Sequence, residues 1–184
     1  MMLPVNFAVE LFFDAAADAR VRAIWRRLAE AGLPSPLQVH GLTPHVSLAA
    51  CSKLVPARLA AGLAAFASAE PAQRIALANP ATFATREGVL YLGAVVTRPL
   101  LDLHAGFFAL FERVAESPWD YYRPGSWVPH CTLSLGLGPA ELAAAIQICV
   151  GLELPIEATL ESVAIVENPS GVVHARFPFQ RAAD

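Results

Sequence analysis

The sequence has little charge, little cysteine and no long apolar run. Charged residues make up 16% of the 184 residues and hydrophobic residues 55%, which excludes a disordered tail or a charged coiled coil and favours a compact globular protein. No apolar run approaches the length that spans a bilayer, so we expect no membrane partner. The formal net charge of -3 argues against the overall basic surface that binds duplex DNA, although a local arginine cluster could still bind one phosphate.

The three cysteines, Cys51, Cys131 and Cys149, provide neither a disulfide framework nor the paired spacing of a metal site. The N-terminal apolar stretch has no Lys or Arg before it and contains Glu10, which argues against a secretory signal peptide. We therefore expect a soluble, cytoplasmic protein. At this length it forms one well-buried domain or two small lobes that share a core.

Hydrophobic patterning alternates between strands and helices along the chain. Asp14 offers an N-cap for the first helix, and Pro56 and Pro139 open two later ones. The patterns predict strands over 6–13, 45–52, 73–85, 89–96 and 129–137, helices over 15–33, 56–69, 98–117 and 139–152, and a final hairpin of 155–168 and 171–180. The order of helix, histidine-led strand, helix and hairpin occurs twice, which indicates an internal duplication of the architecture.

Two short segments support this duplication at the level of single residues. PHVSLA (44–49) and PHCTLS (129–134) share, position by position, a proline, a histidine, a small apolar residue, a hydroxyl residue and a leucine. Because side chains alternate faces along a strand, His45 and Ser47 point the same way, and so do His130 and Thr132. Each strand therefore presents an imidazole beside a hydroxyl.

Two such pairs suit the cleavage of a phosphodiester. The reaction needs a base for the attacking oxygen and an acid for the leaving oxygen, and histidine, with a pKa near 6.5, serves as either. The hydroxyls of Ser47 and Thr132 can donate hydrogen bonds to the non-bridging phosphate oxygens. No metal is then required. Taken singly, His45 or His130 would be an ordinary strand residue, so the hypothesis depends on the matched pair.

At these residues the sequence resembles the two-histidine (2H) phosphoesterase superfamily, also called the 2'-5' RNA ligase-like proteins. The family's pattern is His, any residue, Ser or Thr, and an apolar residue, occurring twice, here as HVSL and HCTL. The resemblance runs from the first strand to the last hairpin. It implies one α+β domain over 1–184 with two pseudo-symmetric lobes, each with a small antiparallel sheet and flanking helices, around a central cleft.

The resemblance also implies a function. By motif match, His45 and His130 are the catalytic histidines, and Ser47 and Thr132 are the phosphate-binding hydroxyls. We expect a monomeric phosphodiesterase, free of metal and cofactor, whose partner is a nucleotide or RNA end with a 2',3'-cyclic phosphate or a 2'-5' linkage. Two alternatives stay open. One is a nucleotide or RNA-end binding protein with little turnover. The other is an RNA 2'-5' ligase, since the same acid and base serve both directions.

One departure concerns charge. Several relatives carry a basic residue shortly after a histidine motif, whereas HCTLSLGLG has none and only Lys53 follows the first motif. Compensation of the phosphate charge must come from elsewhere or be weak. A small or weakly charged substrate, rather than long RNA, would fit this composition.

Other residues are weaker candidates. The segment before the second motif holds aromatic rings that could stack on a base and an arginine that could pair with phosphate, with ordinary loop packing as the competing interpretation. His174 and Arg176 share one face of the last strand, and this face points either into the cleft or to the solvent. We expect His104 to be packed on a helix and His40 to be solvated. Asn6 and Glu10 share a face of the first strand and are given no site role. The candidates for substrate binding are therefore Tyr122, Arg123, Trp127, His174 and Arg176, with Tyr121 in the same loop.

Overall fold

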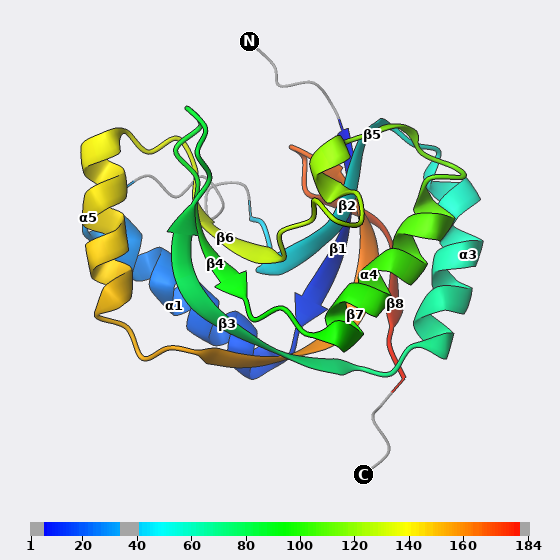
Figure 1. The fold of residues 1–184 in the computed structure, drawn as a ribbon, viewed down its shortest axis with the longest axis horizontal. Helices are drawn as coiled ribbons and strands as arrows, with labels where there is room; N and C mark the ends of the chain where they lie inside the picture. The colour runs from blue at the N-terminus through cyan, green and yellow to red at the C-terminus, as the bar shows by residue number, and fades with distance from the viewer. Residues whose placement is uncertain (1–5, 34–40, 181–184) are drawn as a thin grey trace.

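A computed structural model describes residues 6–33 and 41–180 (Figure 1). The elements in chain order are β1 Asn6–Phe13, α1 Ala15–Glu30, β2 His45–Lys53, α3 Pro56–Ala69, β3 Gln73–Thr82, β4 Leu90–Ala94, α4 Arg98–Phe111, β5 Glu116–Pro118, the 3-10 turn η1 Asp120–Tyr122, β6 His130–Ser134, α5 Pro139–Val150, β7 Ile156–Asn168 and β8 Val172–Pro178.

Local signals account for most of these bounds. Asp14 accepts hydrogen bonds from the backbone N–H groups of Ala16 and Ala17 and so begins α1. Pro56 stands in the first turn of α3, where a missing N–H costs nothing. Every predicted helix and strand is present, with ends that differ by a few residues in several cases.

The prediction of a helix over 98–117 was wrong at its end. The helix α4 stops at Phe111, and the chain turns into the short strand β5, which pairs with β2. Pro118 disfavours a helical conformation at the residue before it, and Ser117 has a positive φ of 53°. Phe111 is the last fully buried residue of the apolar stripe of α4, and residues 112–117 are exposed or only partly buried.

The strands form one antiparallel sheet in the order β5-β2-β1-β7-β3-β4-β6, with β8 paired to β7 beside that path. The long strand β7 belongs to both halves of the sheet. Its first residues pair with β3 and the rest with β1. The two lobes therefore share a sheet, where two separate small sheets were predicted.

From β2 to β6, the strand order is symmetric about the boundary between β7 and β3. It equates β2 with β6, β1 with β4, and β7 with β3, so a pseudo-two-fold axis passes between the two central strands. The repeated unit is strand, helix, histidine-led strand, helix, strand. The predicted duplication is present, but β4 corresponds to β1 rather than to β8, which is an addition after the second unit.

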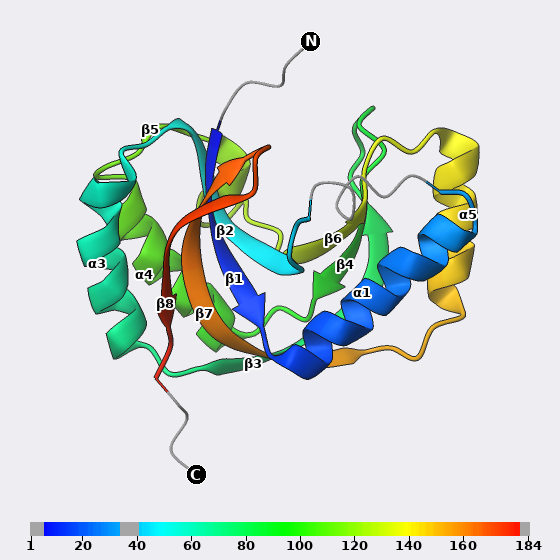
Figure 2. The ribbon, with the colours of Figure 1, turned by 180° about the vertical axis from the view of Figure 1, so that it is seen from behind.

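Helices flank each half of the sheet. In Figures 1 and 2, α1 and α5 lie beside the half with β3, β4 and β6, while α3 and α4 lie beside the half with β1, β2 and β8. Each unit thus contributes one helix to each lobe. Large buried side chains fill the shared core, among them Trp25, Phe107 and Phe111. In the described part of the chain, no helix is long and apolar enough to cross a membrane.

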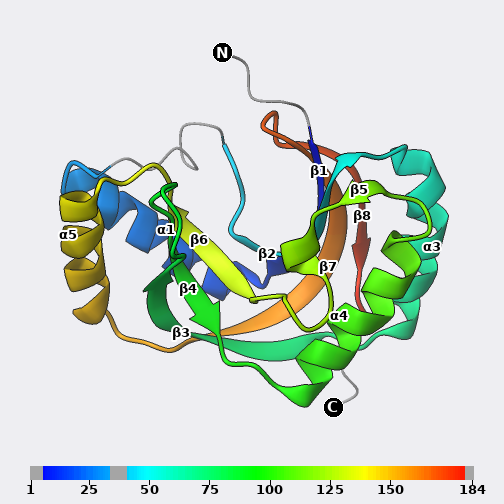
Figure 3. The same ribbon diagram turned by 45° about the horizontal axis from the view of Figure 1, so that its top comes forward.

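The strands β2 and β6, which begin with the two motif histidines, lie far apart in the strand order. They nevertheless contact each other at the centre of the molecule (Figure 3), because the sheet curves between its two halves. The duplication therefore places equivalent segments of the two units side by side.

Candidate active site

The two motif histidines begin β2 and β6 with the same local geometry. Nδ1 of His45 lies 2.8 Å from the carbonyl oxygen of Thr43, and Nδ1 of His130 lies 2.7 Å from that of Val128. In each motif a proline separates the ring from the carbonyl that it binds. A carbonyl oxygen only accepts, so Nδ1 carries a proton in both rings. Nε2 is therefore the free nitrogen of each imidazole.

The strand pattern predicted for the motifs is confirmed. His45 and Ser47 are half-buried while Val46 and Leu48 are buried, and β6 repeats this alternation. The histidines and hydroxyls therefore leave the core on one face of each strand, where a ligand can reach them.

Electrostatics and a direct contact show that the two motifs meet. Burial lowers the pKa of His130 and the nearby charge of His45 lowers it further, while the hydrogen bond to Val128 acts in the opposite direction. The thiol of Cys131, the next residue along β6, is hydrogen-bonded to the backbone of His45. Two rings distant along the chain are thus brought within electrostatic reach.

Two indoles each bond a motif strand to a residue of the other repeated unit. Nε1 of Trp127, just before β6, donates to the carbonyl oxygen of Ser47 at 2.9 Å. Nε1 of Trp25, on α1, donates to the carbonyl oxygen of Thr132 at 3.2 Å. Both hydroxyl residues of the motifs are therefore held at their backbone by a tryptophan from another element.

Glu10 is a residue of the site that the sequence did not reveal. It lies opposite Ser47 in the pairing of β1 with β2, and its side chain is 4% exposed. Its Oε2 lies 3.5 Å from Nδ1 of His45. The only signal was its position on the first strand, because the pairing of that strand with 45–53 could not be seen in the sequence.

The second histidine has aromatic neighbours instead. The rings of Phe83 and Tyr91 each lie 5.0 Å from the ring of His130, between centroids. Tyr91 lies opposite Thr132 in the pairing of β4 with β6, which makes it the counterpart of Glu10 under the pseudo-two-fold axis. The two halves of the site are alike in backbone and different in chemistry.

Tyr122 is the predicted loop residue that reaches the first motif. Its hydroxyl is hydrogen-bonded to the side chain of Ser47, and burial raises its pKa to about 12. The side chain of Arg123, by contrast, contacts Asp120 and Phe108. Its Nε lies 2.9 Å from Oδ1 of Asp120, and its guanidinium carbon lies 5.7 Å from the Phe108 ring centroid.

Trp127 and His104 form a stacked pair, with centroids 4.0 Å apart. His104 is 1% exposed, and its Nε2 lies within hydrogen-bond distance of the carbonyl oxygens of Leu48 and Tyr122. The prediction of a packed helix histidine is confirmed for His104. Trp127 meets the site through its bond to Ser47, and its ring faces His104.

The two candidates on β8, Arg176 and His174, have different neighbours. The guanidinium carbon of Arg176 lies 4.5 Å from the ring centroid of Phe12, whose centroid in turn lies 6.3 Å from that of His45. His174 is paired with Glu167 at 3.0 Å and lies beside the ring of Phe7. His40 falls outside the described residues.

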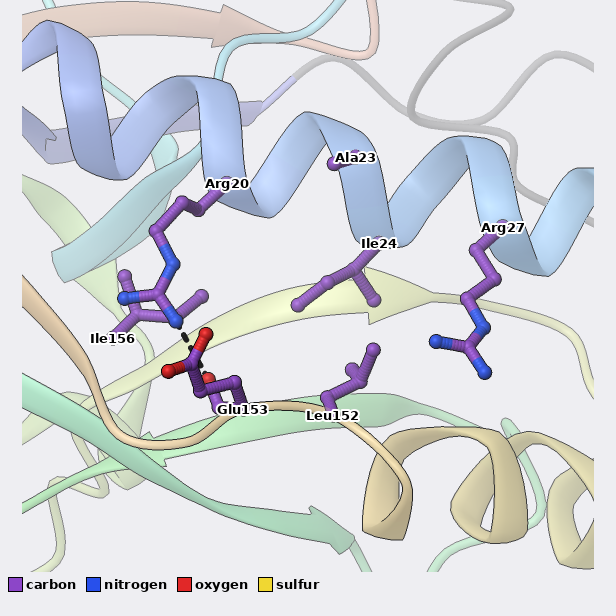
Figure 4. A pocket seen from close by; sticks show the side chains of 7 residues that line it. All are labelled: Arg20, Ala23, Ile24, Arg27, Leu152, Glu153 and Ile156. Atoms are coloured by element: carbon purple, nitrogen blue, oxygen red, sulfur yellow. Dashed lines mark hydrogen bonds between the residues drawn. The ribbon is translucent and has the colours of Figure 1, made fainter.

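Other features lie apart from this constellation. All three cysteines are unpaired and buried. Within 6–33 and 41–180, no three His, Cys, Asp or Glu side chains gather in a way that could ligate a metal ion. A hollow of about 280 Å³ between α1 and the segment before β7 (Figure 4) contains none of the candidate residues; Arg20, Ala23, Ile24, Arg27, Leu152, Glu153 and Ile156 line it.

One comparison with known proteins identifies the family. The family model of the 2'-5' RNA ligase superfamily matches residues 12–171, a span that includes both motifs. The chain belongs to the 2'-5' RNA ligase superfamily. This superfamily is one of two-histidine phosphoesterases, so the family assignment expected from HVSL and HCTL is confirmed. No curated protein sequence matches the chain.

Solved structures share the fold of this superfamily member. A crystal structure described as a phosphoesterase is 17% identical, with a TM-score of 0.64 over 97% of this chain and 99% of the other. Escherichia coli LigT complexed with 3'-AMP is 14% identical, with a TM-score of 0.64 and the same coverage. Kluyveromyces marxianus Usb1 with uridine monophosphate is 10% identical, with a TM-score of 0.53 over 96% of this chain and 98% of the other.

Proposed function

We propose that the protein is a phosphodiesterase that opens 2',3'-cyclic phosphates, or cuts 2'-5' linkages, at a nucleotide or RNA end. The observation that carries this proposal is the matched pair of Nδ1 bonds, which leaves a free Nε2 on both His45 and His130. Membership of a two-histidine phosphoesterase superfamily supports the reaction class. The nucleotides named with LigT and Usb1 support a nucleotide substrate.

The difference between the two half-sites suggests the roles. Burial lowers the pKa of His130, which favours the neutral ring that a general base requires. Oε2 of Glu10 lies 3.5 Å from Nδ1 of His45, so this carboxyl group can orient the ring for proton donation from Nε2, the role of a general acid. We assign His130 as base and His45 as acid for hydrolysis.

Hydrolysis of the cyclic phosphate uses both imidazoles. Nε2 of His130 takes a proton from water as the water oxygen attacks phosphorus. The bond from phosphorus to one ribose oxygen breaks, and Nε2 of His45 gives that oxygen its proton. The product is a phosphomonoester, and proton exchange with solvent restores both rings. The hydroxyls of Ser47 and Thr132 donate to the non-bridging oxygens, whose charge grows in the transition state.

The test is turnover of nucleoside 2',3'-cyclic phosphates in the presence of a chelator, by the native protein and by His45→Ala and His130→Ala. Each substitution should lower kcat by roughly 10²- to 10⁴-fold. Circular dichroism and thermal unfolding of each variant would show that the fold is intact. Rates untouched by both substitutions, or activity lost with the chelator alone, would overturn the proposal.

A second candidate function is a nucleotide-end binding protein with little turnover. The absence of basic residues after the second motif favours it, because weak charge compensation limits the stabilisation of a transition state. Binding of a cyclic nucleotide without product after long incubation would support this candidate, and rapid turnover would exclude it. RNA 2'-5' end joining is the reverse reaction, and incubation of the two ends at high concentration tests it directly.

A further inference from the structure

We propose that Arg176 binds a second phosphate of the substrate, the 5'-phosphate of the same nucleoside whose 2',3'-cyclic phosphate lies at the two motif histidines. This inference deepens the proposed function and rests on it. It names the substrate class as an RNA 3' end or a 5'-phosphorylated nucleotide, in preference to a cyclic nucleoside phosphate without a 5' charge.

Strand register places Arg176 on the same face as the first motif. Ser47 on β2 lies opposite Glu10 on β1, Glu10 lies opposite Ala164 on β7, and Ala164 lies opposite Arg176 on β8. Directly opposed residues in antiparallel strands point to the same face. Four side chains therefore form a row across this half of the sheet, with the motif hydroxyl at one end and the arginine at the other.

The arginine side chain is directed from β8 toward the histidine row. Nε of Arg176 donates to Oγ of Ser162 at 2.8 Å, and Ser162 lies opposite Phe12, which in turn lies opposite His45. The guanidinium carbon lies 4.5 Å from the centroid of the Phe12 ring. The Phe12 ring also lies beside the His45 imidazole, 6.3 Å away between centroids. One aromatic ring thus separates the guanidinium from the reacting group.

This separation fits a second phosphate better than the scissile one. Three strand spacings, about 14 Å in all, divide the backbones of Ser47 and Arg176. A phosphorus centre held by Ser47 and the histidines therefore lies outside direct reach of the guanidinium. A ribose with phosphates at both of its ends can lie across the Phe12 ring, since Arg176 is on one side of that ring and His45 on the other.

The charge balance of the region also points to Arg176. Lys53 is paired with Glu116 at 2.9 Å, and Arg123 is paired with Asp120 at the same distance. Within the described part of the chain, Arg176 has no carboxylate partner and its two Nη atoms make no hydrogen bond. Its Nε and its ring contact hold the group in place while both Nη atoms remain available for the bidentate geometry that phosphate prefers.

Glu10 places a carboxyl group in the same row, and its position agrees with the proposal. Its Oε2 faces His45, and Ala164 lies between it and Arg176 in the row. A negative group beside the first motif would repel an additional phosphate at that point. A second phosphate is therefore better placed beyond Ala164, at the arginine.

The test compares adenosine 2',3'-cyclic phosphate with its 5'-phosphorylated form. The ratio of kcat/KM values for the native protein should favour the 5'-phosphorylated substrate roughly tenfold, as expected for a charge-assisted contact at an exposed arginine. Arg176→Gln should bring the ratio to about one, and Arg176→Lys should keep part of it. The preference should also shrink as ionic strength rises.

Arg58→Gln is the matched control, because Arg58 is an exposed arginine on α3 and its loss changes the net charge equally. This variant should keep the native ratio. Equal use of both substrates by the native protein, or a preference that survives Arg176→Gln, would overturn the inference. So would an equal loss of preference in Arg58→Gln, which would indicate a general effect of charge.

A binding measurement separates this inference from the proposed function. Titration with adenosine 3'-phosphate and adenosine 3',5'-bisphosphate reports the second phosphate without any turnover. Tighter binding of the bisphosphate to the native protein, lost in Arg176→Gln, would support the subsite even if neither cyclic substrate is hydrolysed. Equal binding of both ligands alongside hydrolysis of the cyclic substrates would overturn the subsite and leave the reaction standing.

Discussion

Glu10 and His45 are neighbours across the first pair of strands, with Oε2 of the carboxyl group 3.5 Å from Nδ1 of the imidazole. The same nitrogen lies 2.8 Å from the carbonyl oxygen of Thr43, so two acceptors face one N–H group. At the equivalent place in the other half, Tyr91 lies beside His130. The duplicated backbone thus holds two imidazoles in one orientation, and their cross-strand neighbours make them chemically different.

Glu10→Gln tests the carboxyl group with little change of shape. We expect kcat for a 2',3'-cyclic nucleotide to fall roughly tenfold, because an amide orients the His45 imidazole less well than a carboxyl group. KM should stay level or fall, since a negative group beside an anionic substrate is removed. Steady-state kinetics separate the two parameters. A rise in KM at constant kcat would show instead that Glu10 contributes only to binding.

The pH dependence of activity reports on His130. Burial lowers its pKa, so the ring remains neutral at a pH where an ordinary histidine, with a pKa near 6.5, is already half protonated. As the base, His130 must be neutral, and activity is lost as the pH falls through its lowered pKa. The acid limb of kcat/KM should therefore lie below pH 6.5.

Phe83→Ala provides the matched test of that cause. The Phe83 ring lies 5.0 Å from the His130 ring, and its removal exposes the imidazole to water. The acid limb should then move up toward pH 6.5. A limb that lies at or above 6.5 in the native protein, or one that stays in place in the variant, would contradict burial as the cause.

Much of the fold, and the pairing of the two motif histidines, could be predicted from local sequence signals. The bounds of α3 follow from Pro56 and the apolar spacing, and the start of α1 follows from the side chain of Asp14. The roles of His45 and His130 were suggested by their matched motifs, and the structure brings the two motifs together. These signals are carried by residues close to one another in sequence.

The remainder depends on contacts that are distant along the chain. Glu10 joins the first motif because β1 pairs with β2 in one register, and Arg176 joins the same face because β8 follows two further strand pairings. Neither register can be seen in a single sequence. The end of the helix at Phe111 was missed because the apolar pattern did not show that Glu116–Pro118 would pair with β2.

Tyr122→Phe tests the hydroxyl that reaches Ser47. With a pKa raised to about 12 by burial, the phenol stays protonated across the assay range and acts as a hydrogen-bonding group. Its loss should lower kcat/KM roughly fivefold, in line with one neutral hydrogen bond. The control is Tyr121→Phe, because Tyr121 is 65% exposed; this variant should behave as the native protein does.

A double-mutant cycle shows whether Tyr122 acts through Ser47. If the tyrosine only orients the serine hydroxyl, its removal should have no further effect once that hydroxyl is gone. The double variant Ser47→Ala with Tyr122→Phe should then match Ser47→Ala alone in kcat/KM. Fully additive losses would mean that Tyr122 contacts the substrate independently.

The indole bonds of Trp25 and Trp127 should hold the two motif strands in place. In Trp25→Phe and Trp127→Phe, each carbonyl of a motif hydroxyl residue loses its indole partner. We expect each variant to lose about 2 to 3 kcal/mol of unfolding free energy, of which about 1 comes from the hydrogen bond and the rest from the vacated space. Urea denaturation measures this loss. Trp119→Phe, which removes a weak 3.5 Å contact to Ser52, is the control and should lose less.

Hydrogen exchange distinguishes a tie between the two repeated units from a general loss of packing. If the indoles hold the motif strands, backbone amides of β2 and β6 should exchange faster in both variants, since these strands contact each other at the site. Amides of β3 and β7, along the pseudo-two-fold axis, should keep their protection relative to the global stability. Uniform acceleration across all strands would contradict the tie, because a weaker core alone lowers every barrier to opening equally. A local change at β2 and β6, together with reduced kcat, would show that these two bonds keep the half-sites in register.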